Sequence, residues 1–94
     1  MTNEQSVVSV QSIVTKLAQA LVDDEASVRV DLDAAGPATV FRLHVAPKDM
    51  GRVIGKQGRT ARSLRIIIGA ICETQGVRHC IDIVEAGRDS VLSL

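Results

Sequence analysis

Apolar residues recur with helical spacing in the first quarter of the chain. Between Val7 and Val22 they stand three and four positions apart, and most residues between them are polar. This period predicts an amphipathic helix with one apolar face, formed by Val10, Ile13, Val14, Leu17, Ala18 and Leu21. The acidic run DDE at 23–25 follows. Because negative charge is unfavourable at a helix C-terminus, we expect this run to be the exit turn.

Two stretches of alternating apolar and polar residues come next, and alternation with a period of two predicts half-buried strands. The first runs from residue 26 to 33 and the second from 39 to 46. Ala35-Gly36-Pro37 between them is a turn sequence, so we predict an antiparallel hairpin. In its second strand the residues facing the core are expected to be Phe41, Leu43 and Val45.

The chain then turns from strand to helix. Pro47 ends the second strand, since proline cannot donate a ladder hydrogen bond. Asp49 is placed to cap a short helix over 50–54, and residues 55–58 form a loop after it.

The densest apolar run follows this loop and predicts the longest helix, 59–75, which ends at Gly76. Its predicted buried face consists of Ala61, Leu64, Ile67, Ile68, Ile71 and Cys72. Residues 77–85 then form a third strand, in which Ile81 and Ile83 point inward.

The predicted order is therefore helix, strand, strand, helix, helix, strand. Two strands joined through helices must be parallel, and such a crossover is right-handed. We predict an α/β fold, a two-layer α+β sandwich in which a three-stranded mixed sheet carries its helices on one face. The predicted domain spans residues 7–86, with a flexible N-terminal tail (1–6) and a C-terminal tail (87–94).

Composition and charge then narrow the function. The chain has 94 residues, enough for one domain, and is 46% hydrophobic with a single aromatic residue, so its core is aliphatic. The net charge is zero, but it is segregated. The segment from Lys48 to Arg65 holds six basic residues and one acid, six minus one or +5, and the remainder holds five against ten. A local cationic patch suits an anionic partner.

Several classes of function lack support in the sequence. There is no run of about 18 apolar residues, so we expect no membrane span. The start MTNEQSVVSV lacks the basic and apolar regions of a secretory signal, which predicts a cytoplasmic protein. Cys72 and Cys80, with His79 beside the second, match no common zinc spacing, and no nucleophile accompanies a base. We expect no metal, no cofactor and no catalysis.

The chemistry lies in the loop Gly55-Lys56-Gln57-Gly58. Glycine adopts backbone angles closed to other residues and lets another backbone come near. The loop leads into the N-terminus of the longest helix, where free N–H groups and the helix dipole attract anions, and Lys56 and Arg59 add charge. These features predict a phosphate site. Its spacing is neither a Walker loop nor a dinucleotide fingerprint.

VIGKQGR, set between two helices after a hairpin, resembles the signature of K-homology (KH) RNA-binding domains. In these domains a GXXG loop clamps the backbone of four nucleotides. The helix-first order resembles the type II arrangement. ALVDDEASVRVD and LHVAPKDMGRVIGKQGRTARSLRIII are similar to the KhpA (YlqC) family of small bacterial single-KH proteins, and the likeness covers roughly residues 13–85. Ala61 departs from the KH pattern, which has isoleucine three residues after the second loop glycine.

The resemblance implies non-catalytic binding of single-stranded RNA, action as an RNA chaperone with a KhpB (Jag)-like partner, and a link to cell-envelope and cell-length control. It also implies site residues. Gly55 and Gly58 let the sugar-phosphate chain approach, while Lys56 and Gln57 contact phosphate or sugar. The cationic positions are Arg52, Arg59, Arg62 and Arg65, and the apolar surface for bases is formed by Val53 and Ile54.

One such groove holds about four nucleotides, so its affinity alone is weak and salt-dependent. A second linked site raises apparent affinity by roughly 10²–10⁴-fold. We therefore expect a homodimer or a heteromeric partner. The alternative is a KH-like module that docks a protein and no longer binds RNA. The intact GKQG loop and the local excess of charge argue against it.

Overall fold

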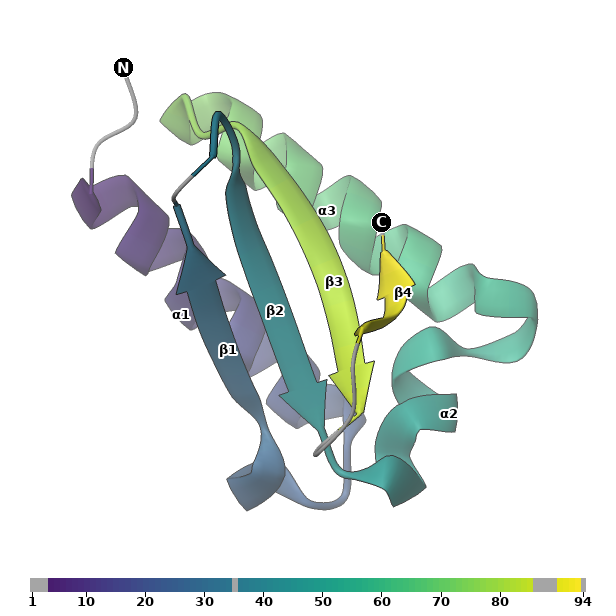
Figure 1. The fold of residues 1–94 in the computed structure, drawn as a ribbon. Helices are drawn as coiled ribbons and strands as arrows, with labels where there is room; N and C mark the ends of the chain where they lie inside the picture. Colours follow the sequence, from purple (N-terminus) through teal and green to yellow (C-terminus); the bar gives the residue numbers. More distant parts are fainter. Residues whose placement is uncertain (1–3, 35, 86–89, 94) are drawn as a thin grey trace.

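The computed structural model describes residues 4–34, 36–85 and 90–93, and Figure 1 shows their arrangement. Two long helices, α1 (Glu4–Leu21) and α3 (Arg59–Gln75), pack on one face of a twisted sheet. A short helix, α2 (Met50–Ile54), precedes α3 in the sequence and follows the second strand of the sheet. The strands are β1 (Arg29–Asp33), β2 (Thr39–Val45), β3 (His79–Glu85) and β4 (Ser90–Ser93).

The sheet has the order β1-β2-β3-β4. The hairpin β1–β2 is antiparallel, with Val30 opposite Leu43. Strands β2 and β3 are parallel and pair Leu43 with Ile83, because α2 and α3 form the crossover between them. The predicted two-layer mixed architecture with helices on one face is confirmed.

The core lies between the sheet and the two long helices. From β2 and β3 it takes the predicted inward residues, each at most 2% exposed: Phe41, Leu43, Val45, Ile81 and Ile83. From the helices it takes small and medium aliphatic side chains, chiefly Val10, Val14, Ala18, Ala61, Leu64, Ile68 and Cys72. This aliphatic core fixes the end of β2 from which α2 and the glycine loop depart.

The ends of the chain differ from the sequence-based picture. Helix α1 begins at Glu4, so residues 4–6, predicted as tail, are helical, and Val7 is already buried. Within the predicted C-terminal tail, Ser90–Ser93 forms a fourth strand, β4, antiparallel to β3. Residues 1–3, 86–89 and 94 lie outside the described residues, and the domain limits 7–86 stay a prediction.

The buried face of α3 differs slightly from the predicted one. Ile67, assigned to the buried face, is 46% exposed, and its neighbour Ile66 is 60% exposed. The buried positions 61, 64, 68 and 72 form the stripe that faces the sheet, and residue 67 lies at its edge. There it borders a shallow apolar groove of about 240 Å³ between α1 and α3, also lined by Leu17 and Leu21.

Candidate nucleic-acid interface

The loop between α2 and α3 is built from residues in unusual backbone conformations. Helix α2 ends where the Gly55 N–H donates to the Gly51 carbonyl oxygen (2.9 Å). Gly55 has φ 77° and ψ 173°, a region that is essentially restricted to glycine. A 3-10 turn, Lys56–Gly58, follows, and its Gly58 N–H donates to the Gly55 carbonyl oxygen (3.1 Å). The chain thus reverses sharply into α3.

The two glycines of this loop have different roles. A Cβ at Gly55 would overlap Thr60 Oγ1 and lie 2.8 Å from the Thr60 backbone nitrogen, so this glycine is required by packing inside the protein. A Cβ at Gly58, where φ is 74°, would meet no atom within 4 Å. The open surface that lets another backbone approach is therefore at Gly58. For Gly55, packing against Thr60 already explains why glycine is needed, and the role of either glycine in RNA binding stays a prediction.

Gln57 also has a left-handed conformation, with φ 56° and ψ 26°. For a residue with a Cβ, this conformation costs roughly 1–2 kcal/mol. The Gln57 side chain is exposed. Strain of this kind is concentrated at functional loops.

Polar backbone groups of the loop are available to a ligand. Helix α3 begins at an N-cap glycine, Gly58, so no side chain caps it, and its first turn has no acidic residue. The hydrogen bond of the 3-10 turn uses the Gly58 N–H, and none of the turn, loop and cap hydrogen bonds among the described residues is donated by the N–H of Lys56 or Gln57. Free N–H groups at a helix N-terminus and in a left-handed turn are donors that bind anions.

The five basic residues of the predicted site fall into two groups. Four are exposed and form no ion pair with any described residue; we call these the cationic track: Lys56, Arg59, Arg62 and Arg65. Arg52 differs, because its Nη2 lies 3.2 Å from Asp23 Oδ2 and its Nε lies 3.9 Å from Asp49 Oδ1. The structure therefore leaves the track free for an anion and engages Arg52 within the protein.

The two residues predicted to offer apolar surface to bases, Val53 and Ile54, differ in burial. Val53 is 0% exposed, because the side of α2 that carries it packs against the hydrophobic core. Its side chain offers no surface to a base, and this assignment is corrected. Ile54, the next residue, is half-buried and keeps an accessible apolar surface beside the loop.

Asp49 stands at the predicted N-cap position of α2, but its side chain makes no capping hydrogen bond to this helix. Its carboxylate is 1% exposed and accepts the backbone N–H of Asp23 at Oδ1 (3.2 Å) and of Asp24 at Oδ2 (3.1 Å). Burial acts to raise the pKa of this carboxyl. The two N–H donors, with Lys48 and Arg52 nearby, outweigh burial and hold the pKa below its ordinary value of 3.8.

This lowered pKa predicts a pH dependence of stability. The unfolded chain binds the proton at higher pH than the folded one, so the contribution of Asp49 is complete above about pH 5 and is lost as pH falls through its folded pKa. We expect the urea midpoint of Asp49→Asn to fall less than that of the unmodified protein between about pH 5 and about pH 3. Parallel midpoint curves over this range would contradict the prediction.

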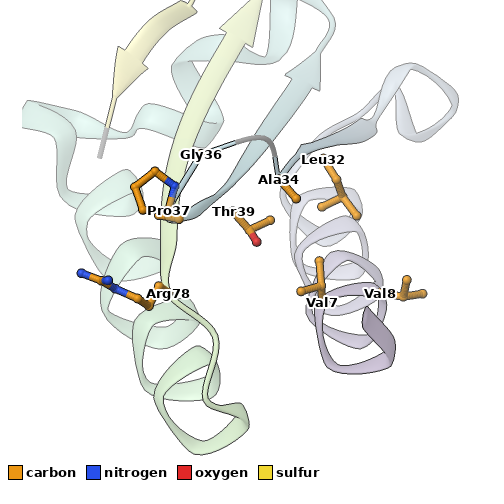
Figure 2. Close-up of a pocket in the computed structure, with 9 residues that line it drawn as sticks. Val7, Val8, Leu32, Ala34, Gly36, Pro37, Thr39 and Arg78 are labelled. Atoms are coloured by element: carbon orange, nitrogen blue, oxygen red, sulfur yellow. The ribbon is translucent and has the colours of Figure 1, made fainter. Parts of the chain in front are cut away.

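Other candidate sites in the described residues lie away from the loop. Burial raises the pKa of the Cys72 thiol, and the side chains of His79 and Cys80 are outside the described set. In the described part of the chain, no three His, Cys, Asp or Glu side chains gather as metal ligands, and no helix is long and apolar enough to cross a membrane. A cavity of about 470 Å³ lies between α1 and the hairpin turn, lined by Val7, Leu32 and Pro37 among others (Figure 2). It is at the start of β2, whereas the loop follows the end of β2.

Comparison with known proteins identifies the family of the chain. Residues 11–83 match the family model described as KhpA/KhpB, KH domain. The chain belongs to the KhpA/KhpB KH-domain family. The glycine loop between α2 and α3 lies within the matched residues. Strand β4 lies beyond the part of the chain that the KhpA/KhpB model matches.

Individual KhpA proteins support the family assignment. The chain is 43% identical over 75 residues to RNA-binding protein KhpA of Halalkalibacterium halodurans, a match that covers 80% of this chain and 99% of that protein. It is 42% identical over 77 residues to RNA-binding protein KhpA of Aquifex aeolicus, covering 82% and 98%. For the Treponema pallidum protein of the same name the identity is 33% over 75 residues, covering 80% and 94%. No solved structure matches the chain.

Proposed function

We propose that this protein binds single-stranded RNA, without catalysis, at the open face of the 55–58 loop. One observation carries the proposal: Gly58 has open space where a Cβ would stand, at the N-terminus of α3, which no side chain caps. The cationic track, which forms no ion pair with any described residue, begins in the same loop at Lys56. This surface can accept a phosphate on N–H donors while the cationic track follows the next phosphates. The name RNA-binding protein carried by the relatives supports the same assignment.

Chemical-shift mapping during titration with a short single-stranded RNA tests this proposal. We expect the largest amide changes at residues 55–59, with weaker ones along the exposed side of α3 at Arg62 and Arg65. The cavity between α1 and the hairpin turn supplies an internal control, because its residues lie at the other end of the sheet. A contact surface centred anywhere but the loop would overturn the assignment.

We also propose that the protein acts as a dimer, in which two such loops raise the affinity for one RNA strand. Supporting this, Ile67 exposes apolar surface on α3 in the groove formed with Leu17 and Leu21. A second copy of the same helix face is the occupant we propose. RNA entering at the loop leaves this side of α3 accessible.

The dimer predicts a specific effect of Ile67→Asp. A charge at the centre of an apolar contact is expected to weaken self-association by at least about tenfold. Sedimentation at micromolar concentration measures it, with Val8→Asp, another exposed apolar residue at the far end of α1, as the matched control. A chain that sediments as a monomer both with and without the substitution would refute the dimer.

The remaining parts of the proposal concern the cell. Action as an RNA chaperone in the cytoplasm, with a KhpB-like partner and with effects on the cell envelope and cell length, follows from the resemblance alone. A protein-docking module without RNA binding is the competing function. Pull-down of partners with and without nuclease separates the two, since partners held by protein contacts survive nuclease and partners held through RNA do not.

A further inference from the structure

Helix α2 carries the glycine loop, yet it is too short to hold its own position. A helix of five residues is not stable by its own hydrogen bonds. Val53 anchors it in the core. The half-buried Met50 packs against the same core. With only these two apolar anchors, the direction in which the loop leaves α2 depends also on polar contacts.

The polar contacts of Asp49 and Arg52 reach the turn that follows α1. Both carboxylate oxygens of Asp49 are used by the backbone N–H groups of Asp23 and Asp24, at 3.2 and 3.1 Å. One turn further along α2, Arg52 Nη2 lies 3.2 Å from Asp23 Oδ2. The N-cap residue of α2 and a residue three positions later are thus joined to the same turn, which constrains both the tilt and the rotation of the helix.

We propose that Asp49 and Arg52, together with Asp23, form a positioning clamp that holds the 55–58 loop at the angle at which it binds RNA. The inference rests on the proposed function of the loop. It assigns no RNA contact to Asp49, whose carboxylate is buried. It also places Arg52 outside the cationic track, acting through Asp23 and not on a phosphate.

The substitution Asp23→Asn separates the clamp from direct binding by Arg52. It removes a negative charge and releases Arg52, so if Arg52 binds phosphate in the complex, affinity for a short single-stranded RNA rises. If the clamp positions the loop, affinity falls about threefold or more despite the more favourable charge, within the range of indirect effects on a site. Asp23 is exposed and its ion pair is at the surface, so the variant is expected to fold.

A second comparison uses salt. Arg52→Ala is expected to lower affinity while leaving the slope of log affinity against log salt unchanged, whereas Arg59→Ala lowers that slope by about 0.7. Arg52→Lys can still pair with Asp23 and should restore most of the affinity. Unchanged or raised affinity in Asp23→Asn, or a salt slope of Arg52→Ala that falls as that of Arg59→Ala does, overturns the clamp.

The clamp also has a readout without RNA. Asp23→Asn lies on the turn after α1, yet it should shift the amide resonances of residues 55–58 in the free protein; Asp33→Asn, on β1 at the other end of the sheet, should not. If the unmodified protein binds no RNA, the proposed function fails, and these resonances still decide the clamp. Resonances of 55–58 that stay in place in Asp23→Asn refute it.

Discussion

A variant that carries Lys56→Asp and Gly58→Asp together is expected to lose roughly 100-fold in affinity for single-stranded RNA while it keeps its fold. The charge at the loop changes by −3, two units from Lys56 and one from Gly58. Each charge-assisted hydrogen bond lost is worth about 1.5–3 kcal/mol, and 1.4 kcal/mol is tenfold in affinity. The repulsion between the new carboxylates and phosphate adds to this loss.

The fold should survive because of where the two residues stand. Lys56 is exposed, and a side chain at Gly58 meets no atom within 4 Å. Aspartate is also one of the few residues that visit the left-handed conformation which position 58 requires. Filter binding measures the affinity, and circular dichroism confirms the fold.

The matched control for this variant is Lys56→Asn with Gly58→Asn. Asparagine has nearly the shape of aspartate and tolerates the same backbone angles, but it adds no negative charge. We expect the asparagine pair to lose far less affinity than the aspartate pair. Equal losses would mean that shape, and not charge, matters at this loop. A folded aspartate variant that binds as well as the unmodified protein would remove the loop from the interface.

Much of this site follows from the sequence, because periodicity and loop chemistry are local properties. The alternation of β2 predicts the inward positions of Phe41, Leu43 and Val45, and the sequence pattern places the glycine loop between two helices, where the structure has it. Contacts between segments that are distant in the sequence cannot be predicted from such local patterns. The hydrogen bonds of Asp49 join residues 25 and 26 positions apart, and nothing in the local pattern distinguishes this carboxylate from an N-cap.

The same limit explains the errors at Val53 and Ile67. Both follow helical apolar patterns, but which side of a helix is covered depends on its neighbours in space. Helix α2 turns Val53 inward, and α1 covers too little of α3 to bury Ile67. Strand β4 was missed because four residues, SVLS, give too short an alternation to distinguish a strand from an irregular tail.

Gly55→Ala is expected to destabilise the protein by about 3 kcal/mol, from roughly 1–3 kcal/mol of backbone strain and a similar cost of overpacking. The new Cβ overlaps Thr60 Oγ1 and crowds the Thr60 backbone nitrogen, in a region of backbone angles that alanine does not adopt. Urea unfolding measures the loss. Truncating the neighbour, Thr60→Ala, should recover only part of it, since the backbone nitrogen at 2.8 Å cannot be removed.

Gly58→Ala is the matched comparison, three residues away in the same loop. Its Cβ enters open space, so only the left-handed backbone opposes it, at about 1–2 kcal/mol. The added methyl group stands where we place the RNA backbone. Gly58→Ala, although less destabilising, should therefore bind RNA more weakly than its loss of stability alone explains. Gly55 would then serve folding and Gly58 would serve binding. If the two alanine variants lose equal stability, the packing of Gly55 against Thr60 does not determine the loop, and this division of roles is wrong.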